Sequence, residues 1–431
     1  MRLNSQEKQE IQAARSRFLA MAATYFLGVF NDNFFKQAAL LLAVLSGLSG
    51  LQGKATMLFS LPFILFSAYG GWLADRFPKR QVIIGVKFLE GIAMLIGAYG
   101  IITLSWGWIL AMVFLMGLQS TFFGPALNGS IPELYPSWYV TKANALLKLV
   151  TTAAILLGMA AAGIALDQHW LDTDIPFGRV LVSVTVLSVA LAGIIAAFGI
   201  KRIENINSKS PFPWAGPIVS LQDSIKLRHD PPLLLAVIGD TYFYFLSLIA
   251  VMLINTMGVN ELQMSVTATS LLAVSLMAGV CIGALVAAKI TSPERWSHVL
   301  GPASFGMGLC LFGAGIVAGM ELDLQWVLLF VSLMGAGFCG GIFLIPLTAF
   351  IQVRPDLNKK GKVIAAANFC AFTGMLIAGS IFTPFDKNFL PSSNVLFLGI
   401  IGMISAVLFY GGHKFINSSA YDGSTGRENN V

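Results

Sequence analysis

The chain has 431 residues, of which 56% are hydrophobic and only 11% are charged. A soluble domain carries about 25% charged residues, so this composition excludes a soluble globular enzyme and predicts a protein that faces lipid. The formal net charge is +6, and the distribution of that charge along the chain is more informative than its size.

Twelve apolar segments follow one another along the chain. Each is close to the ~20 residues that a helix needs to cross the ~30 Å hydrocarbon layer of a bilayer. We place them at 18–47, 53–74, 81–103, 107–129, 143–166, 177–200, 232–257, 264–289, 297–318, 325–350, 361–384 and 391–412. The sequence therefore predicts an all-α polytopic membrane protein with twelve transmembrane helices and both termini on one side.

Lys and Arg residues mark one side of this membrane region. The loops on that side carry nearly all of them, whereas the loops on the other side carry only Lys54, Arg179 and Lys387. Cytoplasmic loops are enriched in Lys and Arg, so we expect both termini to be cytoplasmic. The polar start of the chain and the length of the first segment do not fit a cleavable signal peptide.

The longest polar interruption, 201–231, divides the chain into six segments and six segments. We expect one helix bundle over 1–200, a cytoplasmic linker over 201–231, a second bundle over 232–414 and a flexible cytoplasmic tail over 415–431.

The linker contains one amphipathic pattern. Trp214, Ile218, Leu221 and Ile225 recur at spacings of three and four residues. This spacing predicts a helix lying on the cytoplasmic surface of the membrane, and the pair Pro231-Pro232 ends it.

The two halves repeat several features at corresponding places. Leu115-Met116-Gly117 of the fourth segment is echoed by Leu333-Met334-Gly335 of the tenth, and Asp32 of the first segment corresponds to Asp240 of the seventh. Parallel halves of this kind are typical of transporters that rock two domains around a central substrate site.

The strongest motif is the stretch Gly71–Arg80, between the second and third segments. It resembles the signature loop of the major facilitator superfamily, which implies that family's fold of two pseudo-symmetric six-helix halves. In that family the loop helps to close a cytoplasmic gate, and an ordinary basic loop is the alternative. The residues that we expect to act in gating are Gly71 (close helix contact), Asp75 (facing a helix N-terminus) and Arg76, Lys79 and Arg80 (binding acids or lipid phosphates).

Charged residues inside the segments are candidates for a substrate site, because a charge within a membrane is costly and faces a cavity or a partner. Asp32 and Lys36 are four residues apart and share a helix face, so they either neutralise each other or bind the ammonium and phosphate of a headgroup. Glu90 and Lys87 are one turn apart and are expected to pair. The further candidates for substrate binding are Asn31, Asn33, Gln119, Asn144, Lys148, Asp240 and Asn368.

Several short stretches of the first half resemble the bacterial lysophospholipid transporters. They are Asn31-Asp32-Asn33, Gly124-Pro125-Ala126, Ile131-Pro132-Glu133-Leu134, Ala143-Asn144 and Ala153–Gly158. The resemblance implies inward flipping of lysophosphatidylethanolamine and lysophosphatidylglycerol across the inner membrane of a Gram-negative bacterium. It also implies a cytoplasmic acyltransferase, fused or separate, that re-acylates the lipid.

The resemblance also assigns residues. The acidic residue of the family's first segment corresponds to Asp32, and the family's lysine before Ala-Asn corresponds to Lys142, which we add to the gating group. Lys148 departs from the family, whose members carry an acid there, so the headgroup preference can differ. The fourth segment has no basic residue, which argues against a drug–proton antiporter.

Three other patterns indicate no chemistry. Gly335–Gly340 fits GxGxxG but lies inside an apolar segment without a preceding strand, where glycines serve close helix packing. His169–Asp174 fits the HxxxxD spacing of acyltransferases but lies in a loop on the wrong side. Cys281, Cys310, Cys339 and Cys370 all fall within segments and are read as small buried hydrophobic residues.

We therefore expect a lysophospholipid flippase that works by alternating access, without catalytic residues, metal or cofactor. The expected partners are the lysophospholipid, membrane lipids and the acyltransferase, with no nucleic acid, and the chain is expected to act as a monomer. The alternatives are a small-solute or drug efflux transporter of the same superfamily, and a membrane docking module for an acyltransferase.

Overall fold

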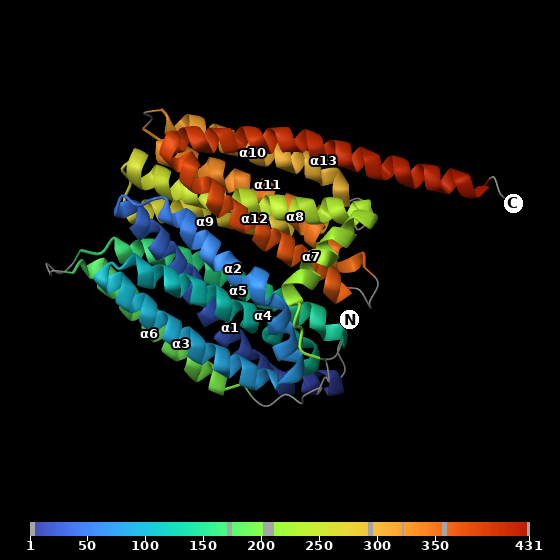
Figure 1. Cartoon of the computed structure of the whole chain (residues 1–431), viewed down its shortest axis with the longest axis horizontal. Coiled ribbons are helices and arrows are strands. Elements are labelled where there is room, and N and C mark those ends of the chain that lie inside the picture. Colours follow the sequence, from blue (N-terminus) through green and yellow to red (C-terminus); the bar gives the residue numbers. More distant parts are fainter. Residues whose placement is uncertain are drawn as a thin grey trace. The chain divides into compact units, whose positions relative to one another are not determined.

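The computed structural model describes residues 5–135, 137–169, 175–200, 211–291, 296–320, 323–355 and 360–428. These residues are almost entirely helical and contain no strand (Figure 1). The α-helices are α1 (Ser5–Leu45), α2 (Leu51–Arg76), α3 (Lys79–Thr103), α4 (Trp106–Leu134), α5 (Ser137–Leu166), α6 (Phe177–Phe198), α7 (Gly216–Lys226), α8 (Pro231–Thr256), α9 (Val266–Ile290), α10 (Leu300–Ala318), α11 (Gln325–Val353), α12 (Lys360–Asn388) and α13 (Pro391–Glu428). Shorter helical turns are η1 (Leu227–His229), η2 (Met257–Glu261) and η3 (Trp296–Val299).

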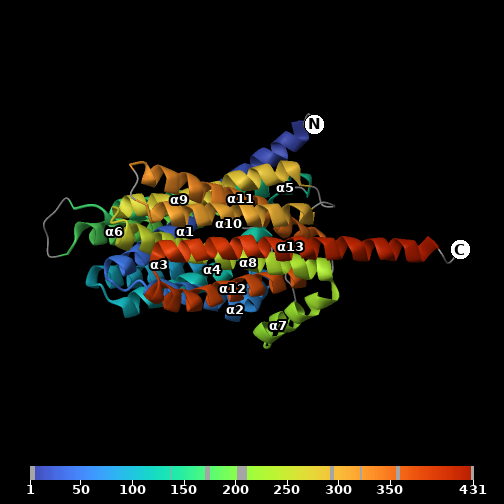
Figure 2. The same cartoon turned by 90° about the horizontal axis from the view of Figure 1, so that it is seen from above.

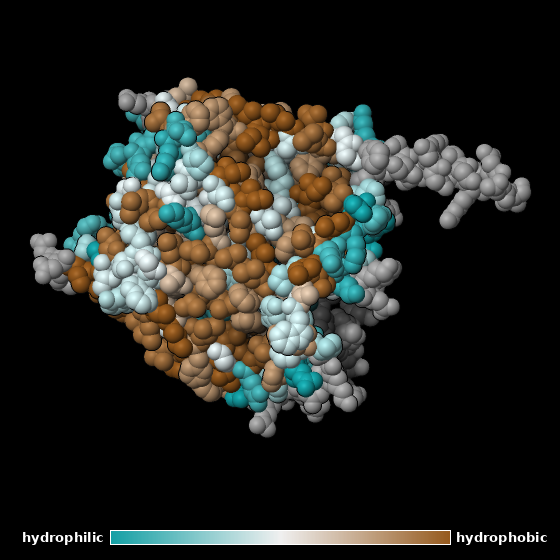
Figure 3. Space-filling view, viewed as in Figure 1, coloured by the Kyte–Doolittle hydropathy of each residue, from teal (hydrophilic) through white to brown (hydrophobic). Residues whose placement is uncertain are grey.

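The predicted transmembrane segments correspond to α1–α6 and α8–α13. Of the described helices, eleven are long and apolar enough to cross a membrane. Helix α1 is not among them, because the polar run Asn31-Asp32-Asn33 interrupts its apolar sequence. Apolar side chains cover most of the face seen in Figure 3, and hydrophilic ones gather toward the helix ends. This distribution agrees with a polytopic membrane protein.

The first compact unit is built from α1–α6. Helix α1 packs on α5 and α6, and α3 packs on α4 and α6. At one end of this bundle Met21, Ile83, Ala126 and Leu127 are fully buried in a shared apolar core. The bundle therefore surrounds α1 and α3 with apolar neighbours, and polar side chains on these helices need partners inside it.

The second compact unit is built from α8–α13. Helix α10 packs on α13 and α11, and α8 packs on α12 and α11. Leu300, Phe343 and Leu347 are fully buried in its core, and the rings of Trp296 and Phe350 stack with centroids 4.2 Å apart.

Each unit holds a short segment that the sequence assigned to the other half. Unit 1 is Met1–Ser46, Lys54–Ile218 and Ser265–Ser270, and unit 2 is Gly47–Gly53, Val219–Met264 and Leu271–Val431. In unit 2, the buried Gln52 donates to Thr256 Oγ1 at 3.0 Å and accepts from Asn255 Nδ2 at 3.1 Å. In unit 1, Thr267 N donates to the Asp167 carboxylate at 3.3 Å. The unit boundaries differ from the predicted ones at these two helix starts because side-chain hydrogen bonds hold them.

The predicted amphipathic helix of the linker is α7, whose apolar stripe is exposed. Ile218, Leu221 and Ile225 are about half exposed, and the preceding Trp214 is 84% exposed. Pro231 and Pro232 were predicted to end α7, and they also form the first turn of α8. Proline is well tolerated in a first helical turn. The Asp230 side chain caps that turn by accepting from Leu233 N.

The tail from residue 415, expected to be flexible, continues α13 as helix to Glu428. The helix projects past the ends of its neighbours in unit 2 (Figures 1 and 2). No proline interrupts the sequence after Pro391, so nothing in it stops the helix.

Glycines of the predicted GxGxxG pattern lie where α11 meets its neighbours. A Cβ at Gly337 would collide with the Leu276 carbonyl oxygen of α9, and one at Gly340 would lie 2.9 Å from the Phe243 ring of α8. The pattern therefore serves close helix packing, as the sequence predicted.

Candidate functional site

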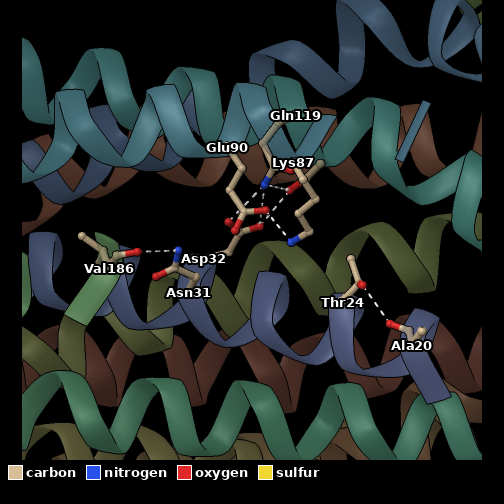
Figure 4. A network of polar contacts seen from close by, with 9 residues as sticks. Ala20, Thr24, Asn31, Asp32, Lys87, Glu90, Gln119 and Val186 are labelled. Carbon is tan, nitrogen blue, oxygen red and sulfur yellow. Dashed lines mark hydrogen bonds and ion pairs between the residues drawn. The ribbon is translucent and has the colours of Figure 1, made fainter. Parts of the chain in front are cut away.

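Charged residues of α1 and α3 and neutral polar residues of α4 in unit 1 form one polar cluster inside an apolar bundle (Figure 4). At its centre is Asp32 of α1, which accepts hydrogen bonds from two neighbouring residues of α4. Gln119 Nε2 lies 3.1 Å from each carboxylate oxygen, and Ser120 Oγ lies 2.8 Å from Oδ2. Both donors are neutral, so the Asp32 carboxylate keeps its charge uncompensated by these bonds. A carboxylate offers about four acceptor positions, which leaves this half-buried group room for another donor.

The ion pair of the cluster is formed by Lys87 and Glu90 of α3. Their Nζ and Oε2 atoms are 2.6 Å apart, and each side chain is only 1% exposed. The Lys87 ammonium also lies 5.1 Å from the centroid of the Phe123 ring. It occupies a hollow at Gly28 of α1, where an added Cβ would be 2.6 Å from Nζ. This pair was predicted from its spacing, and it fixes α3 against α1.

Lys36 is the second base of the cluster, and it does not pair with Asp32. Among the described residues it forms no ion pair, and its ammonium instead lies 5.2 Å from the centroid of the Phe59 ring of α2. No ion pair within 4 Å joins Asp32 to Lys36 among the described residues, although each charge acts on the other. The cluster contains one acid and one base, Asp32 and Lys36, whose charges are not cancelled by a direct contact.

The two asparagines that flank Asp32 point elsewhere. Asn31 is fully buried and donates from Nδ2 to the Val186 carbonyl oxygen of α6 at 3.1 Å. Asn33 donates to the Val29 carbonyl oxygen of its own helix at 2.8 Å. Figure 4 shows Asn31 directed away from the side chains around Asp32. Neither amide contacts Asp32 among the described residues, because successive helix residues face different directions, so their place in the headgroup site stays a prediction.

The remaining candidates of unit 1 do not join the cluster. Asn144 and Lys148 of α5 are exposed, and no contact links either side chain to Asp32 within the described part of the chain. The side chain of Lys142 lies outside the described residues. Lys148 is thus exposed and makes no contact with Asp32 in the described part of the chain, so its role in substrate binding stays a prediction.

Unit 2 contributes a solitary buried acid. Asp240 of α8 is 8% exposed, and its carboxylate forms no hydrogen bond or ion pair with the described residues. Its charge acts on Tyr244 of the same helix and on Cys370 of α12. Asn368 of α12 is exposed. Asp240 therefore matches Asp32 by position in its half but lacks the donors that Asp32 has.

The predicted gate loop joins α2 to α3, and its parts behave differently. Asp75 and Arg76 are exposed, and Lys79 is half-buried within reach of the Asp75 charge. Arg80 instead binds the carbonyl oxygens that end α6, with Nε 2.5 Å from Ile200 O and Nη2 3.4 Å from Phe198 O. A cation at this place suits the negative end of the α6 dipole. This contact corrects the expectation that Arg80 binds acids or lipid phosphates.

The close helix contact lies at Gly70 rather than at Gly71. A Cβ at Gly71 would have nothing within 4 Å, whereas one at Gly70 would lie 2.5 Å from the Thr121 carbonyl oxygen of α4. The predicted contact was therefore misplaced by one residue. Neighbouring helix residues point about 100° apart around the helix axis, so Gly71 faces a different direction from Gly70.

Sequence reasoning missed Ser120, Phe59 and Phe123. Ser120 directly follows Gln119, and adjacent helix residues do not normally share a face, so nothing in the spacing drew attention to it. Phe123 was accessible to prediction, because it is four residues after Gln119 and lies on the same side of α4.

Comparisons with known proteins agree with the predicted fold. Residues 16–379 match the family model described as Major Facilitator Superfamily. Among solved structures, the inward-open xylose transporter XylE of E. coli superposes with a TM-score of 0.69 at 12% identity, covering 91% of this chain and 95% of that one. The peptide-transporter-family protein PepTSo gives 0.69 at 12% identity, covering 93% and 98%. At such identities these structures establish the fold alone.

Curated relatives are more specific. A protein named lysophospholipid transporter LplT from Enterobacter sp. (strain 638) is 28% identical over 390 residues, covering 86% of this chain and 89% of the relative. The protein of the same name from Escherichia fergusonii is 27% identical over 380 residues, covering 84% and 87%. Both similarities extend across both halves.

Proposed function

The chain belongs to the major facilitator superfamily, and we propose that it transports lysophospholipids across the inner membrane of a bacterium. The observation that carries the proposal is the polar cluster around Asp32, in which an acid and a base stand in an apolar bundle without a direct ion pair between them among the described residues. The relatives named lysophospholipid transporter support the choice of substrate class.

Asp32 and Lys36 suit the two charges of a phospholipid headgroup. The ammonium of lysophosphatidylethanolamine would donate to the open acceptor positions of Asp32, and its phosphate would meet the Lys36 ammonium. A bare zwitterionic headgroup cannot cross hydrocarbon at low cost, so such a site lowers the barrier to flipping. Lysophosphatidylglycerol, which has no ammonium, would rely on Lys36 and on hydroxyl hydrogen bonds to Asp32.

The direction of transport follows from the same proposal. Lysophospholipids would move inward by alternating access, with both termini in the cytoplasm and the α2–α3 loop acting in the cytoplasmic gate through Asp75, Arg76 and Lys79. A cytoplasmic acyltransferase, fused or separate, would re-acylate the lipid, so the chain itself need not be an enzyme. We propose that the chain works as a monomer.

Liposome transport tests the proposal. The purified protein is reconstituted, fluorescent lysophosphatidylethanolamine is added outside, and the fraction protected from a membrane-impermeant quencher is followed over time. We expect protein-dependent protection that is at least tenfold slower in Asp32→Asn and unchanged in Lys226→Ala, which removes an exposed surface charge. Protection no faster than in protein-free liposomes would refute lysophospholipid transport. An undiminished rate in Asp32→Asn would refute the site.

The same liposomes separate the alternatives. A drug or small-solute transporter would move a cationic dye such as ethidium but not the lipid. A docking module would bind the acyltransferase without moving either. Competition by unlabelled lysophosphatidylglycerol, but not by the two-chain phosphatidylglycerol, is expected if the site selects single-chain lipids.

A further inference from the structure

Where helices α10 and α11 meet, both carry the same five-residue pattern, glycine-x-glycine-x-cysteine. Gly306, Gly308 and Cys310 recur on α10, and Gly335, Gly337 and Cys339 recur on α11. The second set overlaps the GxGxxG pattern, which the proposed transport function leaves without a chemical role. In each helix the first glycine and the cysteine are four residues apart and share a face.

The two sets pack against each other reciprocally. The Cys339 Sγ atom lies against Gly306, where an added Cβ would be only 2.8 Å away, and the Cys310 Sγ atom lies against Gly335, at 3.1 Å by the same measure. Each thiol therefore fills the hollow that the glycine of the other helix leaves. The two thiols are within hydrogen-bonding reach of each other. This arrangement brings two cysteines of separate helices together near the middle of both.

The contact between the two thiols is accessible from outside the helix bundle of unit 2. Both cysteines are half-buried rather than buried. On α10 they are flanked by Phe305 and Leu309, which are 49% and 51% exposed. In a transmembrane unit these outward apolar side chains meet lipid tails, so a reagent that reaches the thiols must dissolve in the hydrocarbon layer.

We propose that Cys310 and Cys339 are an oxidation site at which a disulfide bond bridges α10 and α11. The oxidant is a lipid-soluble quinone. The two S–H bonds break and one S–S bond forms, while the two electrons and two protons reduce the quinone to the quinol.

Close glycine contacts favour this bridge. A disulfide requires the two Cα atoms to approach within about 7 Å, and small residues at a helix crossing permit such backbone approach. Two cysteines that merely filled space would not need each other's thiol as nearest polar neighbour. Cys281 and Cys370, on α9 and α12, have no such reciprocal arrangement with each other.

The test uses the purified full chain in liposomes. A fully ring-substituted benzoquinone, which thiols cannot alkylate, is added as the oxidant, and the copper–phenanthroline complex is added to a parallel sample. The protein is then cleaved after methionine. Met320 and Met334 lie between the two cysteines, so a bridge appears in the mass spectrum as a linked pair of fragments. We expect this linked pair with both oxidants and its loss after treatment with a phosphine reductant.

Matched variants decide the assignment. Cys310→Ser and Cys339→Ser should each abolish the linked fragments, whereas the double variant Cys281→Ser with Cys370→Ser should retain them. A bridge formed with copper but not with the quinone would overturn the quinone as oxidant. If neither oxidant forms the bridge while both thiols still react with a small maleimide, the proposed site is wrong.

Discussion

At the scale of single residues, the cluster in unit 1 combines two ways of keeping charge inside an apolar bundle. Lys87 and Glu90 form an ion pair at 2.6 Å, and each side chain is only 1% exposed. Asp32 is held by the neutral donors Gln119 and Ser120 and stays half-buried. The first arrangement is structural, and the second leaves a charge that a ligand can meet.

Glu90→Gln should destabilise the protein strongly. It leaves the Lys87 ammonium buried without a carboxylate, which typically costs about 3–5 kcal/mol. Thermal unfolding in detergent measures the loss, and Lys226→Ala is the control. Lys226 pairs with Asp223 at the surface, where it is 68% exposed, so its removal should cost under about 1 kcal/mol. Equal stability of Glu90→Gln and the wild type would contradict a closed ion pair.

Ser120→Ala should weaken transport without unfolding the protein. A hydrogen bond to a charged group contributes about 1.5–3 kcal/mol, so we expect at least a tenfold lower kcat/KM for lysophosphatidylethanolamine flipping. Ser130→Ala is the matched control, since the Ser130 hydroxyl donates only to the Ala126 carbonyl oxygen of its own helix. The same change in flipping for both variants would contradict a particular role of Ser120.

At the scale of helices, apolar length predicted most spans closely, whereas α1 begins at Ser5 rather than at 18 and α13 ends at Glu428 rather than at 412. The segments 177–200 and 325–350 became α6 (Phe177–Phe198) and α11 (Gln325–Val353), because the length of a span is set by the membrane itself. Packing decides which helix faces meet. A helix that is hydrophobic on every side gives no sequence signal of which face is packed against a neighbour. For this reason the sequence found Asp32, Glu90 and Gln119 but also proposed Asn144 and Lys148, which the structure leaves exposed.

Glycine substitutions should separate contact glycines from tolerant ones. A Cβ at Gly337 would collide with the backbone of α9, whereas one at Gly313 would meet nothing within 4 Å. We expect Gly337→Ala to cost about 1–3 kcal/mol of stability and Gly313→Ala to be neutral or stabilising by up to about 1 kcal/mol. Unfolding temperatures of the two variants compare them directly, and the reverse order would show that α9 and α11 do not pack as described.

At the scale of the whole molecule, the loops divide into two chemically distinct sets. Basic residues collect in one set, which includes the α2–α3 loop with Arg76 and Lys79. Gly47, between α1 and α2, belongs to the other set, and His229, between α7 and α8, belongs to the basic set. Both are exposed. From the positive-inside rule we expect His229 to lie in the cytoplasm and Gly47 outside it.

Cysteine labelling checks this topology. In a background with all four native cysteines changed to serine, Gly47→Cys should react with a membrane-impermeant maleimide in intact spheroplasts. His229→Cys should react only after the membrane is permeabilised. The opposite pattern would invert the orientation on which the inward direction of transport depends.

The polar run in α1 also affects how the chain enters the membrane during synthesis. An Asp at the centre of a helix adds about 2.5–3.5 kcal/mol to the cost of insertion, and α1 precedes the other described helices in the chain. The side chains that satisfy Asp32 belong to α4, with Gln119 lying 87 residues later in the sequence. Until α4 is made, α1 must be retained by the insertion machinery or by its neighbours. Asp32→Leu should therefore let α1 insert on its own, so the residue proposed to bind substrate also delays co-translational assembly.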